Sequence, residues 1–194
     1  NRSPSPEPWA ANNINGSPFD DVIDADALHD ANSAQIYKDS INAGGGNDLI
    51  RAGKGGDWID GGAGNDTIDG GVPAERSLDP AVNTWELENH IRYSAAFKSY
   101  EITQRIDNAA GAITGIAAGD YFTVEDLRSG SPDGTDTLFN IDTLDFSDRQ
   151  IRLTLQYGLQ QDRVWVPNDS TPDDPSDGTW EQVVRGLNIN GGMY

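Results

Sequence analysis

Isoleucine recurs at every ninth position in the most regular part of the chain, where Ile50, Ile59 and Ile68 follow one another at equal spacing. Each isoleucine is the centre of an x-Ile-x triplet, which predicts a minimal strand with one side chain directed inward. The six residues before each triplet are rich in Gly and Asn, which adopt positive φ easily and turn the chain tightly. Because a single row cannot bury its isoleucine, we expect the rows to coil into a solenoid with a narrow core.

Three consecutive rows share one pattern, with Gly at positions two and four, Asp at position six and Ile at position eight. They cover residues 43–51, 52–60 and 61–69. An earlier and less regular row covers residues 16–24. Each regular row therefore predicts one glycine turn followed by one short strand.

Residues 25–42 separate the early row from the regular rows and number eighteen, which is twice nine. Asp30 and Asp39 fall on the position-six register, and Ile41 falls on position eight. The segment nevertheless contains no glycine, so it cannot make the same turns. Two interpretations stay open: a loop inserted after the first row, or two degenerate rows.

With two rows per turn of the coil, rows on the same side are eighteen residues apart. That spacing places Asp48 near Asp66, and Asp39 near Asp57. Carboxylates stacked about 4.8 Å apart, the spacing of neighbouring strands, repel one another unless a cation lies between them. Ca²⁺ takes about six to eight oxygen ligands with tolerant geometry, whereas Mg²⁺ demands a stricter octahedron. Because exposed glycine carbonyls add neutral oxygens, the pattern predicts calcium.

The rows resemble the RTX nonapeptide repeat, Gly-Gly-x-Gly-x-Asp-x-U-x with U a large apolar residue, which forms the parallel β-roll of secreted bacterial proteins. The resemblance implies that each calcium ion lies between two turns on one side of the roll. Backbone carbonyls and position-six carboxylates would then be its ligands. We expect about three or four ions, or more.

The resemblance implies three sites at particular residues of this sequence. The first comprises Gly44, Gly46 and Asp48 with Gly61, Ala63 and Asp66. The second comprises Ala52, Lys54 and Asp57 with Asp39, where Gln35 and Tyr37 replace the glycines of the pattern. The third comprises Gly53, Gly55 and Asp57 with Gly70, Val72 and Glu75, although Pro73 departs from the pattern. Asp21 begins the other side of the ladder.

Beyond Gly71, apolar residues alternate with polar ones, which predicts half-buried strands. These strands are expected at residues 100–106, 121–124, 151–155 and 164–166. We interpret residues 72–166 as a β-rich domain that caps the roll and covers its open edge. The predicted fold is therefore all-β: a short parallel β-roll over residues 9–71, with an insertion at about 25–42, followed by a β-rich capping domain.

Proline-rich segments flank this core. Residues 1–8 and 167–178 combine proline with serine or aspartate, which is typical of linkers. Thr179 and Gln182 fit a capping box, which predicts that residues 167–194 end in a short docking helix. The chain begins at Asn1 without methionine, so we expect it to be part of a longer polypeptide.

Residues 133–148 resemble a segment that often follows RTX rows in large secreted bacterial proteins. Some of those proteins are adhesins, and others carry a peroxidase domain. Asp133, Asp136 and Asp148 have two open interpretations. They bind a further calcium ion, or they cap and shape turns, which aspartate does readily.

The charge excludes several classes of function. The chain has 25 Asp and 7 Glu against 13 Lys plus Arg, and its formal net charge is −19. Such a chain is repelled by phosphate backbones, so we expect no nucleic-acid partner. No apolar run is long enough to span a membrane, so no membrane insertion is expected. Cysteine is absent, which excludes disulfides and thiolate sites within this sequence. The two histidines, His29 and His90, are interpreted as surface or packing residues.

The combined interpretation is a calcium-binding module of a larger secreted bacterial protein, exported by type I secretion, that folds on extracellular Ca²⁺ and contacts the remainder of its host polypeptide. It is not expected to be an enzyme. Two alternatives stay open. The module binds a sugar or peptide as part of a calcium-dependent adhesin, or it is an accessory segment of a secreted peroxidase or hydrolase. The five tryptophans line such a binding surface, or they pack in the core and its cap, which is the favoured interpretation.

Overall fold

The structure is a computed structural model, and it describes residues 9–10, 12–28, 36–71, 88–105, 121–153, 163–167 and 178–182. Regular structure in these residues is almost entirely β-strand. The helical elements among them are two short 3-10 turns, η1 (Asp26–Leu28) and η3 (Phe97–Ser99). The described part of the chain is therefore all-β, as predicted. None of its helices is long and apolar enough to cross a membrane.

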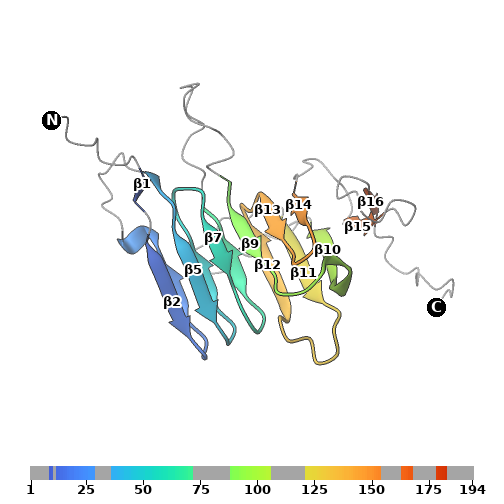
Figure 1. The fold of residues 1–194 in the computed structure, drawn as a ribbon, viewed down its shortest axis with the longest axis horizontal. Coiled ribbons are helices and arrows are strands. Elements are labelled where there is room, and N and C mark those ends of the chain that lie inside the picture. Colours follow the sequence, from blue (N-terminus) through green and yellow to red (C-terminus); the bar gives the residue numbers. More distant parts are fainter. Residues whose placement is uncertain are drawn as a thin grey trace, which may run out of the picture.

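The described strands form two large sheets and one small pair (Figure 1). The six-stranded sheet has the order β14 (Gln150–Arg152), β13 (Thr143–Asp145), β9 (His90–Arg92), β7 (Trp58–Asp60), β5 (Ser40–Gly44), β2 (Asn13–Ser17). The eight-stranded sheet has the order β16 (Gly178–Gln182), β15 (Arg163–Pro167), β10 (Tyr100–Arg105), β11 (Tyr121–Asp126), β12 (Thr135–Phe139), β8 (Thr67–Asp69), β6 (Leu49–Arg51), β3 (Val22–Asp24). The small pair joins β1 (Trp9–Ala10) to β4 (Ile36–Tyr37).

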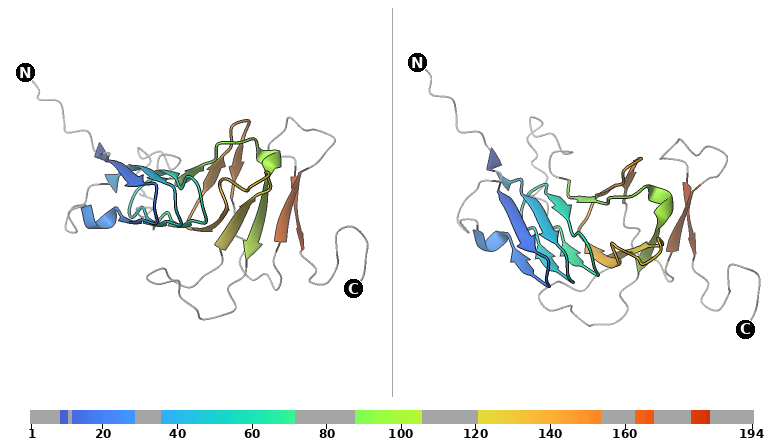
Figure 2. Two further views of the ribbon diagram at one scale, coloured as in Figure 1. Left: turned by 90° about the horizontal axis from the view of Figure 1, so that it is seen from below. Right: turned by 60° about the horizontal axis from the view of Figure 1, so that its bottom comes forward.

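Strands β5 to β8 alternate between the two large sheets, so the chain coils. In the six-stranded sheet Ser40 pairs with Trp58, and in the eight-stranded sheet Leu49 pairs with Thr67, both in parallel. Each pair is eighteen residues apart, which is two rows per turn of the coil. Figure 2 shows these strands in two layers that are joined by tight turns.

The first turn of the coil is longer than the others. Asn13 pairs with Ser40, and Val22 pairs with Leu49, so twenty-seven residues separate these rungs. Asp39 and Ile41 are buried at the register positions that the sequence indicated. The end of the 25–42 segment is therefore a degenerate row, and nine additional residues separate it from the early row. Part of that excess, residues 29–35, lies outside the described residues.

The strands after the repeats extend the same two sheets. β9 adds to β7, β12 adds to β8 and β13 adds to β9, all in parallel. The direction then reverses, because β14 pairs antiparallel with β13 and β11 pairs antiparallel with β12. The segment that was interpreted as a cap therefore contributes further parallel strands to both layers before antiparallel strands complete the mixed sheets.

The core is a double column of aliphatic side chains between the layers. One column is Ile23, Ile50, Ile68 and Leu138, and the other is Ile41, Ile59, Ile91 and Leu144, each at most 8% exposed. Burying one such side chain contributes about 1.5–3 kcal/mol. Past the repeats the core becomes aromatic, with Tyr93, Tyr100 and Phe97 packed around Phe146.

The strands predicted downstream of the repeats are present, with bounds that differ by a few residues. The predicted docking helix is wrong at its start, because Gly178–Gln182 is strand β16 and pairs antiparallel with β15. Thr179 and Trp180 favour strands, and a partner strand outweighs a local capping pattern. Residues 1–8 and 183–194 lie outside the described residues, as do most of the second linker and the histidine at position 29.

Candidate metal site

Glycine carbonyls stack from one turn of the coil to the next. A Cβ atom on Gly62 would lie 2.0 Å from the carbonyl oxygen of Gly44, and one on Gly64 would lie 2.0 Å from that of Gly46. Both residues also have positive φ, of 92° and 123°. Only glycine fits such a close approach in that conformation, so the pattern in the sequence is a direct requirement of the stacked turns.

The position-six aspartates form a ladder of hydrogen bonds across the starts of neighbouring strands in the eight-stranded sheet. The backbone N–H of Asp21 donates to Oδ1 of Asp48 at 2.7 Å, and that of Asp48 donates to Oδ1 of Asp66 at 2.9 Å. The N–H of Asp66 in turn donates to Oδ1 of Asp136 at 3.0 Å. Asp48, Asp66 and Asp136 thus each cap the strand of the preceding turn through Oδ1.

A second ladder lies along the six-stranded sheet. The N–H of Asn12 donates to Oδ1 of Asp39 at 3.1 Å, and the N–H of Asp39 donates to Oδ1 of Asp57 at 2.8 Å. The N–H of Asp57 then donates to Oδ1 of Asn89 at 3.0 Å, and that of Asn89 donates to Oδ2 of Asp142 at 2.9 Å. Asp48 and Asp57 therefore belong to different ladders, although they are consecutive in the repeat.

The first ladder does not use the second carboxylate oxygen of Asp48 or of Asp66. Among the described residues, Oδ2 of Asp48 and Oδ2 of Asp66 are buried and have no hydrogen-bond partner. Burial, followed by the charge of Asp48, raises the pKa of Asp66 to about 6, against an opposing hydrogen bond from the Asp48 N–H. Burial also raises the pKa of Asp48. Buried, unpaired carboxylate oxygens are strongly unfavourable, and a cation between them would remove that penalty.

The two turns that carry the backbone residues of the first predicted site lie side by side. Gly45 and Ala63 form a parallel bridge, and a Cβ atom on Gly61 would lie 2.4 Å from Oδ2 of Asp66. No group of three or more His, Asp or Glu side chains suited to a metal gathers within the described residues. A cation here would therefore depend on backbone carbonyls, whose second lone pairs are available even when one hydrogen bond is accepted.

The second predicted site is only partly described. Asp39 and Asp57 are brought together by the ladder, and both are buried. Ala52 is buried and Lys54 is exposed in the turn before Asp57. Gln35 lies outside the described residues, whereas Tyr37 is the last residue of strand β4.

The third predicted site differs from expectation. The sequence paired Asp57 with Glu75, whereas in the structure Asn89 follows Asp57 in the ladder. The side-chain N–H₂ of Asn89 donates to the carbonyl oxygens of Gly70 at 2.9 Å and Asn140 at 3.0 Å. A neutral amide thus binds an oxygen that the resemblance assigned to calcium. Val72 and Glu75 lie outside the described residues.

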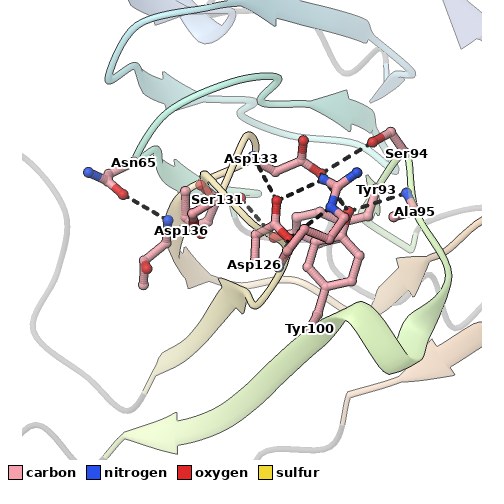
Figure 3. A network of polar contacts seen from close by, with 12 residues as sticks. Asn65, Tyr93, Ser94, Ala95, Tyr100, Asp126, Ser131, Asp133 and Asp136 are labelled. Carbon is pink, nitrogen blue, oxygen red and sulfur yellow. Dashed lines mark hydrogen bonds and ion pairs between the residues drawn. The ribbon is translucent and has the colours of Figure 1, made fainter.

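The aspartates after the repeats are held by the protein's own donors (Figure 3). Oδ2 of Asp136 accepts a hydrogen bond from the Tyr93 hydroxyl at 2.9 Å. Arg128 pairs with Asp126 at 2.8 Å and with Asp133 at 2.7 Å. Hydrogen bonds from the Arg128 guanidinium lower the pKa of Asp126 to about 2. Asp148 accepts a hydrogen bond from the backbone N–H of Phe97.

These contacts favour the turn-and-capping interpretation of Asp133, Asp136 and Asp148, since each carboxylate already accepts a hydrogen bond or ion pair from a protein group. The sequence did not identify three of the site's hydrogen-bond partners, Asn89, Tyr93 and Arg128. One signal was available, because Asp136 and Leu138 have the same spacing as positions six and eight of the repeat.

Comparison with known families agrees with the geometry. Residues 37–72 match the family model of the RTX calcium-binding nonapeptide repeat in four copies. The matched segment contains Asp39, Asp48, Asp57 and Asp66, the central aspartates of both ladders. A search of curated proteins found no match to the chain.

Proposed function

We propose that the coiled segment is a parallel β-roll that binds calcium between successive turns, and that bound calcium stabilises its folded state. The observation that carries this proposal is the pair of buried, unpaired oxygens on Asp48 and Asp66, within a segment that matches a calcium-binding repeat. The Asp39–Asp57 step of the second ladder is the candidate for a second ion. Beyond these two steps, the Asn89 amide and the Tyr93 hydroxyl donate to oxygens in place of a cation.

Calcium concentration would then decide whether the module is folded. The net charge of −19 opposes compaction, and stacked carboxylates without a cation add to that repulsion. Extracellular calcium modules bind with a Kd of about 0.1–1 mM. At about 10 mM calcium, each such site contributes about 1.4–2.7 kcal/mol, so two sites contribute about 3–5 kcal/mol. That amount is a large part of the stability of an ordinary domain.

A module that needs about millimolar calcium is suited to the outside of the cell, where calcium is abundant. We therefore propose that the module belongs to a longer secreted bacterial protein, which is exported unfolded by type I secretion and folds outside the cell. Any catalysis would belong to other parts of that protein.

A calcium titration followed by circular dichroism tests the proposal. β-structure should grow with added calcium, should be lost on addition of EGTA, and should grow much less with magnesium at the same concentration. The Asp48→Asn variant should shift the calcium midpoint upward, and Asp20→Asn, at an exposed neighbouring turn, should shift it far less. Identical spectra with calcium and with EGTA would disprove the proposal.

A further inference from the structure

A shallow pocket lies on the outer face of the six-stranded sheet. Short polar side chains of β2 and β5 line it together with longer side chains of β7 and β9. The former are Asn13, Asn15, Ser40 and Asn42, and the latter are Trp58, Asp60 and Arg92. The four positions on β2 and β5 carry small amides or hydroxyls, whereas the neighbouring strand β7 carries an indole.

Trp58 is the largest side chain that lines the pocket. Its ring stacks on His90 of the next strand, with centroids 4.2 Å apart and planes within 12° of parallel. Nδ1 of His90 is 2.8 Å from Oδ2 of Asp145, which fixes the imidazole. Because His90 covers one face of the indole, the opposite face is turned toward β5 and the pocket. The residue is 41% exposed, whereas tryptophan is highly buried on average.

The pocket contains one negative and one positive side chain. Asp60 and Arg92 both line it, and the Arg92 guanidinium lies 5.8 Å from the centroid of the Trp58 ring. One carboxylate and one guanidinium leave the pocket close to neutral, on a molecule whose net charge is −19. An anionic ligand would be repelled by the molecule as a whole, so the pocket is suited to a neutral ligand rich in hydrogen-bonding groups.

We propose that this pocket binds a neutral oligosaccharide, with one pyranose ring packed on the face of Trp58 opposite His90. The C–H groups of a pyranose carry partial positive charge, and the face of an indole is negative, so the two surfaces attract. The side-chain amides of Asn13 and Asn42 each present a donor and an acceptor to sugar hydroxyls. Asp60 and Arg92 complete the polar rim with one strong acceptor and one strong donor.

The pocket is assembled from consecutive turns of the coil. Ser40 directly follows Asp39, and Trp58 directly follows Asp57, so both sides of the pocket adjoin the second ladder. Oligosaccharide binding therefore needs the folded coil, and it rests on the proposed calcium function only to the extent that calcium is required for folding. A protein that folds without calcium would keep the pocket.

Isothermal titration calorimetry of the whole chain in about 10 mM calcium tests the proposal. The probes are cellohexaose, maltohexaose, β-mannohexaose and chitohexaose, with hexagalacturonate as an anionic comparison. At least one neutral probe should bind with a Kd below about 1 mM, and hexagalacturonate should bind more weakly. Trp58→Ala should weaken that binding at least about tenfold, and Asn42→Ala should weaken it several-fold.

The Phe19→Ala variant is the matched control, since Phe19 is an aromatic residue that is 74% exposed in a turn and does not line the pocket. It should leave binding unchanged. Circular dichroism at the same calcium concentration identifies variants that fold normally, and Asn42→Ala tests the pocket if Trp58→Ala does not fold. Absence of binding by all four neutral probes would overturn the proposal. Equal binding by wild type and by folded Trp58→Ala and Asn42→Ala would also overturn it.

Discussion

The backbone N–H of Asp48 donates to Oδ1 of Asp66, eighteen residues later, at 2.9 Å. The bond joins two consecutive turns on one side of the coil and occupies one of the two carboxylate oxygens of Asp66. The remaining oxygens of both aspartates are buried without a partner among the described residues. Asp57, which lies between them in the sequence, has its ladder contacts with Asp39 and Asn89 instead.

Asp48 and Asp66 should therefore be coupled in calcium binding. Asp48→Ala and Asp66→Ala each damage the same site, so the double variant should cost less than the sum of the two single variants. Asp48→Ala combined with Asp57→Ala should be closer to additive, because these residues belong to different ladders. Calorimetry of the calcium midpoint and stoichiometry for the three single and two double variants measures both couplings. Stronger coupling of Asp48 to Asp57 than to Asp66 would contradict the two-rows-per-turn arrangement.

The stacked turns should be intolerant of a methyl group at particular glycines. Gly64→Ala would place Cβ about 2 Å from the Gly46 carbonyl oxygen at a φ of 123°, so we expect a loss of more than about 2 kcal/mol. Gly45→Ala is the matched control, because its φ is not in the left-handed region and its nearest neighbour would be 3.8 Å away. Urea denaturation in saturating calcium compares the two. Equal losses for both variants would show that the turns do not stack as described.

Asn89→Asp should convert the Asn89 step of the second ladder into a metal-dependent one. The substitution removes the two N–H donors to the carbonyls of Gly70 and Asn140 and adds a negative charge beside them. Without calcium the variant should be destabilised by about 2–4 kcal/mol, because buried acceptors lose their partners. In saturating calcium, the stoichiometry should rise by one ion.

Mass spectrometry under native conditions and calorimetry count the ions. Asn42→Asp is the control for charge alone, since Asn42 is exposed on the outer face of the sheet. An unchanged ion count together with full stability of Asn89→Asp would show that the amide does not stand in for a cation.

The Asp126–Arg128 pair should contribute stability that depends on pH. The pKa of Asp126 is lowered to about 2, so its contribution is fully present above its ordinary value of 3.8 and is lost as the pH falls toward 2. At pH 7, Asp126→Asn should reduce the free energy of unfolding by about 2 kcal/mol. The difference from wild type should shrink between about pH 4 and pH 2.

Urea midpoints of the two proteins across this range give the measurement, and taking their difference cancels carboxylates common to both. Glu125→Gln, at an exposed neighbouring position, should differ little from wild type at any pH. A difference between Asp126→Asn and wild type that stays constant down to pH 2 would disprove the assignment.

The sequence predicted the regular part of the coil because every level of the pattern agreed there. The isoleucines define the core, the glycines define the turns and the aspartates define the ladders. Ile50 and Ile68 pair in register as the spacing required. Asp39 was also placed in its correct register, even though no glycine identified its turn.

The sequence was less informative where long-range pairing decides the structure. Asn89 follows Asp57 in the ladder after thirty-two residues, a spacing that no multiple of nine predicts. β12 joins β8 across seventy residues, so the later strands enter the coil from far along the chain. At Thr179 a local helix signal gave way to strand pairing with β15, because hydrogen bonds to a neighbouring strand outweigh a single cap.

Alternation of rows between two sheets has a consequence for how such chains can evolve. Duplication of a single nine-residue row would move every later strand to the opposite sheet, and β9 and β12 would meet the wrong partners. Rows can therefore be gained or lost only in pairs, which is eighteen residues at a time, unless an unpaired row stays outside the coil. The strands that follow Asp21 and Asp48 are neighbours in one sheet although twenty-seven residues separate them, so this turn exceeds the eighteen-residue turns by one nine-residue unit. An odd insertion in a related chain should be recognisable as a loop.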